Sequence, residues 1–573
     1  MVRNHAAFDV LPSNVSVRTR VHEYGGGSYC LGEDSLYYVE EQSQQVFVRT
    51  AAGRCRQLSS QPNARFADMI ECLSLGLLIC VRETHSEEQV VNELVGISLR
   101  DGVTQVLASG ADFYSSPRLS DCETKLAFIS WDHPHMPWQQ NRLWVAECNA
   151  IAELGELTEV RSQGASSKSQ PIWREDGSLI FLDDAANGWW NLTHYRGGEC
   201  STLAPIEADL GRAQWDLGAS SLAIAGNSVF ALGSKHGQER LMLLDDQART
   251  WLDLGVAQTQ MSHLCHWTHG LGYLGASPLS GQGVYTIDSH LRTQRTVLGA
   301  AALPLDEASI STAESFQFKA RNGSSAQGFF YAPVNSEVGI ASEPPPLVVV
   351  MHGGPTSACN NAFKAQIQYW TTRGFAVFDI NYRGSTGFGR NYRLGLAKQW
   401  GVVDVEDCVD GVEALVRAGK VDRERIVIRG GSAGGYTALA AAASSDVFAA
   451  VGCHYGVADL TLLARDTHKF ESRYLDHLIG PYPEQKRLYE QRSPINRLEH
   501  IKCPVFISHG ELDQVVPVNQ AHAIYNALSQ REQVVELLLF ADERHGYAKE
   551  DNIAKLLKSE LGFYIRVFEK QGE

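Results

Sequence analysis

The pattern of apolar and polar positions divides the chain into two parts that meet near residue 305. In the first part, apolar strands alternate with turn residues and polar loops, as in "SQPIWREDGSLIFLDD" and "SSLAIAGNSVFALGS". Such units recur roughly every 40–50 residues, a spacing typical of propeller blades and too long for a β-helix repeat. They begin near Tyr24, Phe66, Phe113, Lys168, Gln214 and Gln258. We therefore predict an all-β propeller of about six to seven blades over residues 1–305, with the completeness of the first blade left open.

The second part, residues 306–573, alternates continuous apolar strands with amphipathic helices. The stretches "LVVVM", "GFAVFDINY" and "RIVIRG" are typical of buried strands, and "DVEDCVDGVEALVRAG" has apolar residues at helical spacing. Apolar strands that alternate with helices indicate a mostly parallel sheet covered on both faces. We therefore predict an open α/β domain here.

A serine flanked by glycines marks the junction between one of these strands and the next helix. The stretch "GGSAG" over residues 430–434 is the only G-x-S-x-G match in the chain. After a strand and before a helix, this motif is typical of a nucleophile elbow, in which glycines permit a sharp turn. The helix N-terminus also brings backbone N–H groups near Ser432, where negative charge develops during acyl transfer. The alternative is a glycine turn with an incidental serine.

The chain offers partners for this serine in the order that the architecture requires. A nucleophilic serine needs a base and an acid that orients it, and these follow later strands in the order acid, then histidine. The strand "PVFISHG" is followed by "ELDQVVP", which contains Asp513 and its rival Glu511. The strand "VVELLLF" is followed by "ADERHGY", which contains His545. We assign Ser432, Asp513 and His545 as the catalytic triad, which makes residues 306–573 an α/β-hydrolase catalytic domain.

An oxyanion hole completes the predicted site. The strand "LVVVM" ends in "HGGP", a loop of the type whose backbone N–H faces the nucleophile in α/β-hydrolases. Glycine lets the backbone approach a substrate carbonyl oxygen closely. We predict the N–H of Gly354 as one donor and the N–H of Ala433, immediately after the serine, as the other.

Composition narrows the remaining function classes. The 573 residues carry a net charge of −16, which disfavours nucleic acid or an anionic membrane as a partner. The twelve cysteines form no C-x-x-C pair and no residues show metal-ligand spacing, so we expect free thiols and no metal or organic cofactor. The N-terminus lacks an apolar signal region and no apolar run has transmembrane length. We expect a cytoplasmic protein, with homo-oligomerisation left open.

The motifs together resemble the prolyl oligopeptidase family of serine peptidases, specifically its acylaminoacyl-peptidase and dipeptidyl-aminopeptidase-like branch. The resemblance is carried by "HGGP", "NYRGSTGFG", "GGSAGGY", "HGELDQVVP" and "RHGY", and in the first part by "RTRVHEYGGG", "WDHPHMPW" and "GWWNL". It covers nearly the whole chain and implies a β-propeller joined to a C-terminal α/β-hydrolase domain. It also implies a cavity between the domains that admits only small or unstructured peptides.

The resemblance suggests further substrate contacts and reveals two departures. Some exopeptidases of the family hold the free amine of the substrate with propeller acids, so Glu23 is a candidate amine ligand; the alternative is an ordinary exposed carboxylate. Tyr436 and Tyr455 are further candidate substrate contacts. Relatives that bind the substrate carbonyl with an arginine carry it two residues after the catalytic Asp, where this chain has Val515. Relatives also have a longer N-terminal part, from which we expect that a blade or a segment packed on the hydrolase domain is missing.

These observations predict a serine peptidase that hydrolyses short peptides, or acyl-aminoacyl and aminoacyl amide bonds, through an acyl-enzyme on Ser432. One alternative is a carboxylesterase or amidase, because the same triad serves ester and amide substrates. The alternative from another class is a propeller interaction module joined to an inactive hydrolase domain. The intact set of Ser, Asp and His disfavours that alternative.

Overall fold

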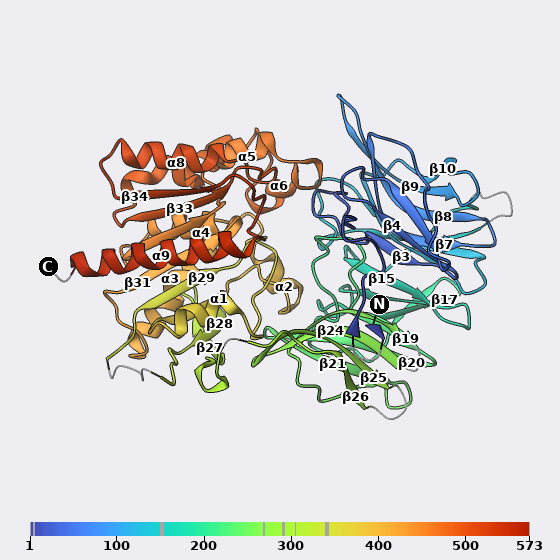
Figure 1. The fold of residues 1–573 in the computed structure, drawn as a ribbon, viewed down its shortest axis with the longest axis horizontal. Helices are drawn as coiled ribbons and strands as arrows, with labels where there is room; N and C mark the ends of the chain where they lie inside the picture. Colours follow the sequence, from blue (N-terminus) through green and yellow to red (C-terminus); the bar gives the residue numbers. More distant parts are fainter. Residues whose placement is uncertain are drawn as a thin grey trace.

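The computed structural model describes residues 2–3, 6–148, 154–267, 270–288, 293–303, 305–337 and 343–571. Figure 1 shows two domains side by side, an all-β domain from the first part of the chain and an α/β domain from the second. The predicted architecture, a β-propeller followed by an α/β-hydrolase domain, is confirmed.

Within the described residues the propeller contains six four-stranded antiparallel sheets, each made of consecutive strands. Their strands are β3 (Tyr29–Leu31), β4 (Ser35–Val39), β5 (Val46–Thr50), β6 (Cys55–Gln57); β7 (Ala64–Cys72), β8 (Leu77–His85), β9 (Val90–Ser98), β10 (Thr104–Ala108); β11 (Phe113–Leu119), β12 (Lys125–Trp131), β13 (Arg142–Glu147), β14 (Thr158–Val160); β15 (Lys168–Trp173), β16 (Leu179–Asp183), β17 (Asn191–Arg196), β18 (Glu199–Thr202); β19 (Leu222–Ala225), β20 (Ser228–Lys235), β21 (Gln238–Asp245), β22 (Thr250–Asp253); β23 (Gln260–Trp267), β24 (Gly270–Ser277), β25 (Ser280–Asp288) and β26 (Gln294–Leu298). The first strand of one sheet packs against the first strand of the next, as β3 does with β7 and β7 with β11. The first sheet has four strands, so this blade is complete. A short hairpin, β1 (Val2–Arg3) and β2 (Ala6–Ala7), precedes it.

The α/β domain is built on one eight-stranded sheet with the order β27-β28-β30-β29-β31-β32-β33-β34. These strands are β27 (Glu314–Lys319), β28 (Ser325–Tyr331), β29 (Leu347–Met351), β30 (Ala376–Asn381), β31 (Ile426–Gly431), β32 (Ala450–His454), β33 (Val505–Gly510) and β34 (Val535–Phe540). The strand β28 runs antiparallel to its two neighbours, β27 and β30, and the six strands β29 to β34 run parallel to one another. Their mostly apolar sequences fit a sheet that is buried on both faces.

Helices cover the two faces of this sheet and approach the propeller at one end. They are α1 (Ala365–Thr371), α2 (Gly389–Arg393), α3 (Val403–Arg417), α4 (Ala433–Ala442), α5 (Leu460–Asp466), α6 (Tyr474–Leu478), α7 (Lys486–Arg492), α8 (Asn519–Ser529) and α9 (Glu550–Gln571), with the 3₁₀ turns η1 (Glu307–Ser309), η2 (Leu394–Leu396), η3 (Lys469–Glu471) and η4 (Pro494–His500). Both α2 and α6 lie on the side of the hydrolase domain that faces the propeller (Figure 1).

Two buried propeller aspartates bind the segment that contains α2. Asp209 accepts hydrogen bonds of 3.1 Å from two backbone N–H groups of the loop 387–389. Asp184 accepts a hydrogen bond of 2.7 Å from Arg390 and another from the fully buried Arg393. Buried ion pairs need partners in well-defined positions, so these contacts fix the orientation of the hydrolase domain against the propeller.

An aromatic side chain of the hydrolase domain inserts into the propeller. Phe470, in η3, lies within 6.4 Å, between ring centroids, of His22, Tyr24, Phe113, Trp131, Trp138 and Trp215. Phe470 is 2% exposed and belongs to a buried apolar cluster that extends through both domains. Because the contact is buried, it fixes η3 against the propeller, and Glu471 of η3 lines the same pocket as Ser432.

No helix among the described residues is long and apolar enough to cross a membrane. No three side chains of His, Cys, Asp or Glu among them come together in a way that could hold a metal ion.

Candidate active site

Ser432 lies at the sharp turn between β31 and α4. Its backbone has φ 54° and ψ −126°, a conformation that is unfavourable for a residue with a side chain. The turn is held by the Ser432 N–H, which donates to the carbonyl of His454 at 3.0 Å, and by the Tyr436 N–H, which donates to the carbonyl of Ser432 at 3.1 Å. The strained turn directs the hydroxyl away from the strand and toward the loop that carries His545.

Close packing explains the glycines of this turn. A Cβ built on Gly434 would lie 2.2 Å from the backbone oxygen of Met351, and one built on Gly431 would lie 2.5 Å from the hydroxyl of Tyr455. Side chains at these positions would push α4 away from β29 or displace the serine. The glycines are therefore required by the packing of the turn.

Replacing Gly434 with alanine is expected to destabilise the hydrolase domain by about 2–4 kcal/mol, because the rigid backbone of β29 cannot move away from the new methyl group. Thermal unfolding should show a midpoint lowered by roughly 5–10 °C. Gly562→Ala is the matched control, since it is also a glycine in a helix, and its Cβ would meet only the flexible end of Arg566 at 3.3 Å. That variant should be neutral or slightly more stable, because alanine favours helices. Equal midpoints for the two variants would contradict this account of the turn.

The structure brings Ser432, His545 and Asp513 together. The hydroxyl Oγ of Ser432 lies 3.0 Å from Nε2 of His545, and Nδ1 of His545 lies 2.8 Å from Oδ2 of Asp513. With the proton on Nδ1 donated to the carboxylate, Nε2 is free to accept the hydroxyl proton. The three groups come from loops that follow β31, β33 and β34, so the parallel sheet places them at one edge.

The acid of this set is buried and held by several donors. Its Oδ1 accepts hydrogen bonds of 2.9 Å from the N–H groups of Val515 and Val516. Burial by itself raises the pKa of Asp513, but the contacts with His509 and His545 and the backbone donors outweigh it and bring that pKa to about 2. Glu511, the alternative acid, is exposed, and the hydrogen bond of His545 goes to Asp513.

A narrow, mostly apolar pocket opens at the serine. Gly354 and Ala433 line it together with Ser432, and its other walls are Pro355, Trp400, Val457, Leu463, Thr467, Glu471, Tyr474, Leu475, Leu478, Val515 and Val516. Among the described residues the N–H of Gly354 has no protein acceptor. Ala433 is the first residue of α4, where N–H groups have no acceptor within the helix. The arrangement provides two free donors for a carbonyl oxygen and an apolar wall for the adjoining side chain.

One acidic residue lies in this otherwise apolar pocket. Glu471 is half-buried, and its Oε1 accepts a hydrogen bond from the hydroxyl of Tyr24, which reaches over from the propeller. Within the described residues Glu471 forms no ion pair, so its negative charge is not compensated by the protein. An uncompensated carboxylate in an apolar pocket is costly, which favours a cationic ligand there.

The candidate substrate contacts from sequence lie in different surroundings. Glu23 lines a larger cavity, but its carboxylate already has a protein partner, because Arg65 binds it at 2.5 Å. Tyr436 is fully buried, and its hydroxyl donates to the carbonyl of Arg492 at 3.2 Å; it lies in the core beneath the elbow, away from the narrow pocket. The ring of Tyr455 lies 5.0 Å from that of His545, beside the predicted base.

The sequence gives no signal that Glu471 and Tyr24 lie together beside Ser432. The hydrogen bond that joins them spans 447 positions of the chain. Glu471 occurs in "HKFESRYL", which contains no motif, and Tyr24 follows directly after the acid that we had selected. The resemblance to exopeptidases pointed to an amine ligand in the propeller, whereas the unpaired carboxylate beside the serine belongs to the hydrolase domain.

Comparison with known proteins agrees with this geometry. A family model described as the prolyl oligopeptidase family matches residues 361–571. The chain is 30% identical over 220 residues to dipeptidyl aminopeptidase BIII of Pseudoxanthomonas mexicana. This alignment covers 37% of this chain and 32% of that protein. It is also 30% identical over 208 residues to the acylamino-acid-releasing enzyme of Arabidopsis thaliana, in an alignment that covers 35% of this chain and 27% of that enzyme. The alignments thus span about a third of the length of these curated relatives.

Similarity to solved structures extends over both domains. The structure of a puromycin-hydrolyzing peptidase of Mycobacterium tuberculosis superposes with a TM-score of 0.94 at 32% sequence identity, covering 99% of this chain and 90% of that one. A crystal structure of puromycin hydrolase superposes with a TM-score of 0.93 at 31% identity, covering 98% and 89%. The propeller and the hydrolase domain are therefore matched as one unit.

Proposed function

Since the chain belongs to the prolyl oligopeptidase family, we propose that it is a serine peptidase that hydrolyses short peptides or aminoacyl amides through an acyl-enzyme on Ser432. The observation that carries the proposal is the hydrogen-bonded series from Ser432 to His545 to Asp513 beside a pocket with two free N–H donors. Peptidase activity also fits the names of the proteins that the chain resembles.

The geometry supports the following reaction. Oγ of Ser432 attacks the scissile carbonyl carbon while Nε2 of His545 takes the hydroxyl proton. The carbonyl oxygen becomes an oxyanion and is held by the N–H groups of Gly354 and Ala433. The C–N bond then breaks, and His545 gives its proton to the leaving amine. Water repeats the sequence on the acyl-enzyme and releases the acid, while the ionised Asp513 stabilises the charged imidazole in both halves.

We further propose that the acyl residue of the substrate carries a free amine and that Glu471 binds it. With the carbonyl oxygen in the oxyanion hole, we place the side chain and the α-amine of the same residue in the narrow pocket, which Ser432 also lines. The apolar walls suit an apolar side chain, and Glu471 is the acidic group of that pocket. The hydroxyl of Tyr24 and the insertion of Phe470 hold this carboxylate in place. The proposed enzyme therefore removes single apolar residues from the N-termini of short peptides.

Glu471→Gln is expected to lower kcat/KM for a leucyl arylamide by about 30-fold or more, because a charge-assisted hydrogen bond to the ammonium group becomes a neutral one. Hydrolysis of the acetylated leucyl arylamide, which has no ammonium group, should change by less than about threefold. The measurement is kcat/KM for both substrates with wild type and variant.

Glu23→Gln is the matched control for this prediction. It removes a propeller carboxylate that is already paired with Arg65, so it should leave the preference for the free amine unchanged. If Glu23→Gln removed that preference and Glu471→Gln did not, the amine ligand would be Glu23.

A small substrate panel tests the proposed function as a whole. It contains leucyl, acetyl-leucyl and glycyl-leucyl arylamides together with a simple aryl ester. The proposal expects the leucyl arylamide to have the highest kcat/KM. Turnover of the ester without turnover of any arylamide would instead identify a carboxylesterase.

We also propose a cytoplasmic location. All twelve cysteines are free, including five that are buried, Cys72, Cys80, Cys359, Cys408 and Cys453. Unpaired thiols in this number favour a reducing compartment. Fractionation of the source cells with an antibody against the protein would test this proposal.

A further inference from the structure

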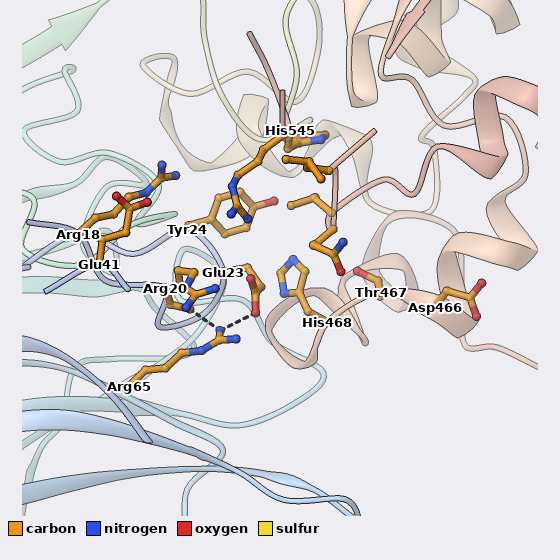
Figure 2. Close-up of a pocket in the computed structure, with 14 residues that line it drawn as sticks. Arg18, Arg20, Glu23, Tyr24, Glu41, Arg65, Asp466, Thr467, His468 and His545 are labelled. Carbon is orange, nitrogen blue, oxygen red and sulfur yellow. Dashed lines mark hydrogen bonds and ion pairs between the residues drawn. The ribbon is translucent and has the colours of Figure 1, made fainter. Parts of the chain in front are cut away.

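A second, larger cavity lies beside the triad, between the propeller and the hydrolase domain. Its volume is about 610 Å³, and it reaches His545. Four arginines line it: Arg18, Arg20 and Arg65 from the propeller, and Arg544 from the hydrolase domain. Figure 2 shows Arg18, Arg20 and Arg65 on the propeller side of this cavity, opposite His468 and His545.

Only one of these four cations is neutralised by an ion pair within the described residues. Arg65 binds Glu23 at 2.5 Å and Glu83 at 3.3 Å. The side chains of Arg18, Arg20 and Arg544 form neither an ion pair nor a hydrogen bond with any described residue. Glu23, Glu41 and Asp466 also line the cavity. None of them forms an ion pair with Arg18, Arg20 or Arg544 among the described residues, although Glu23 and Glu41 lie close enough to Arg20 to act on its charge.

Arg20 is the most constrained of the unpaired arginines. Its Nε is buried and has no acceptor in the described protein. Burial is the largest cause of the lowered pKa of Arg20; the charges of Arg65 and Arg544 lower it further, whereas those of Glu23 and Glu41 raise it. A buried guanidinium donor without an acceptor is unfavourable, and a bound anion would offset that cost.

The position of these arginines relative to the triad indicates which anionic group of the substrate they bind. His545 gives its proton to the leaving amine, so the leaving part of the substrate departs on the side of His545. Arg544 immediately precedes His545, and both line the larger cavity, whereas Ser432 and the oxyanion donors line the narrow pocket. Every unblocked peptide carries its terminal carboxylate on the leaving side, and arginine binds carboxylates through paired N–H donors.

We propose that Arg20 and Arg544 bind the C-terminal carboxylate of the leaving peptide, with Arg18 adding positive charge at the propeller wall. This inference rests on the proposed function and adds a second anchor to it. The substrate is held by its amine at Glu471 and by its carboxylate at the arginines. The site would favour substrates short enough for both ends to be held at once. It also offsets the repulsion that a chain of net charge −16 exerts on an anionic substrate end.

The test compares Leu-Gly-Gly with its C-terminal amide. Wild type is expected to hydrolyse the free acid with a kcat/KM about tenfold or more above that of the amide, and the ratio should fall as ionic strength rises. In Arg20→Gln and in Arg544→Gln the ratio should fall to about one to three. Arg544 is exposed, so its variant still provides a test if Arg20→Gln folds poorly. Arg417→Gln, an exposed arginine in the last turn of α3 and outside the cavity, should leave the ratio at the wild-type value.

The outcomes separate this inference from the proposed function. Hydrolysis of acid and amide at equal rates by wild type would overturn the carboxylate site while leaving the peptidase in place. An equal fall of the ratio in Arg417→Gln would also overturn the site, since the effect would then reflect overall charge. Absence of any peptide hydrolysis by wild type would instead contradict the proposed function.

Discussion

Ser432→Ala is expected to lower kcat for aminoacyl arylamides by about 10⁵-fold or more and to abolish labelling by a fluorophosphonate probe. The probe reacts only with a serine that is activated by a neighbouring base, and Ser432 lies 3.0 Å from Nε2 of His545. Its hydroxyl also lies at the N-terminus of α4, where free N–H groups stabilise the developing oxyanion. Labelling is followed by gel fluorescence and turnover by release of the arylamine.

The control for this variant is another serine of the same helix region. Ser444 follows the last residues of α4; its hydroxyl donates to the carbonyl of Ala440 at 2.8 Å and accepts a hydrogen bond from Arg497 at 3.2 Å. Ser444→Ala should keep wild-type labelling and turnover within about twofold, because surface substitutions of this kind change little. Equal labelling of wild type and Ser432→Ala would show that the probe reacts elsewhere, and Ser432 would lose its assignment as nucleophile.

The features of the fold that depend on local pattern could be predicted from the sequence. The blade repeat and the alternation of strands and helices can be recognised in short stretches of sequence, and the structure has both predicted domains. The nucleophile elbow could also be predicted from a short stretch, because the glycines of "GGSAG" between a strand and a helix permit the sharp turn. The approach of Asp513 and His545 follows from the parallel sheet, in which the carboxyl ends of adjacent strands lie at one edge.

The substrate contacts could not be predicted because they depend on how the two domains meet. Glu23 forms an ion pair with Arg65, on the next blade, and no local feature of "RTRVHEYGGG" reveals that partner. The role that we propose for Glu471 depends on Tyr24 and on the insertion of Phe470 among propeller aromatics. Tyr436 follows the elbow in sequence, but the helical turn points it into the core. Motifs identify which groups react, whereas contacts between distant segments decide what surrounds them.

Asp513→Asn is expected to lower kcat by about 10⁴-fold while leaving the fold intact. The amide is nearly isosteric with the carboxylate, so the hydrogen bonds from the N–H groups of Val515 and Val516 can persist. It cannot, however, hold the Nδ1–H tautomer of His545 as the carboxylate does, and it cannot stabilise the imidazolium that forms when Ser432 is deprotonated. Steady-state kinetics on a leucyl arylamide, with circular dichroism to verify folding, is the measurement.

The acid at position 511 provides the matched comparison. Glu511→Gln removes an exposed carboxylate two residues away and should change kcat by less than about threefold. A mild effect of Asp513→Asn together with a severe effect of Glu511→Gln would transfer the role to Glu511.

The stability of the protein should depend on pH through Asp513, because the pKa of this carboxyl is lowered from 3.8 to about 2 in the folded protein. The stability that this ionised carboxylate contributes is fully present above pH 3.8 and is lost only as the pH falls through about 2. Any activity that wild type loses between pH 8 and about pH 5 must therefore come from the protonation of a group other than Asp513.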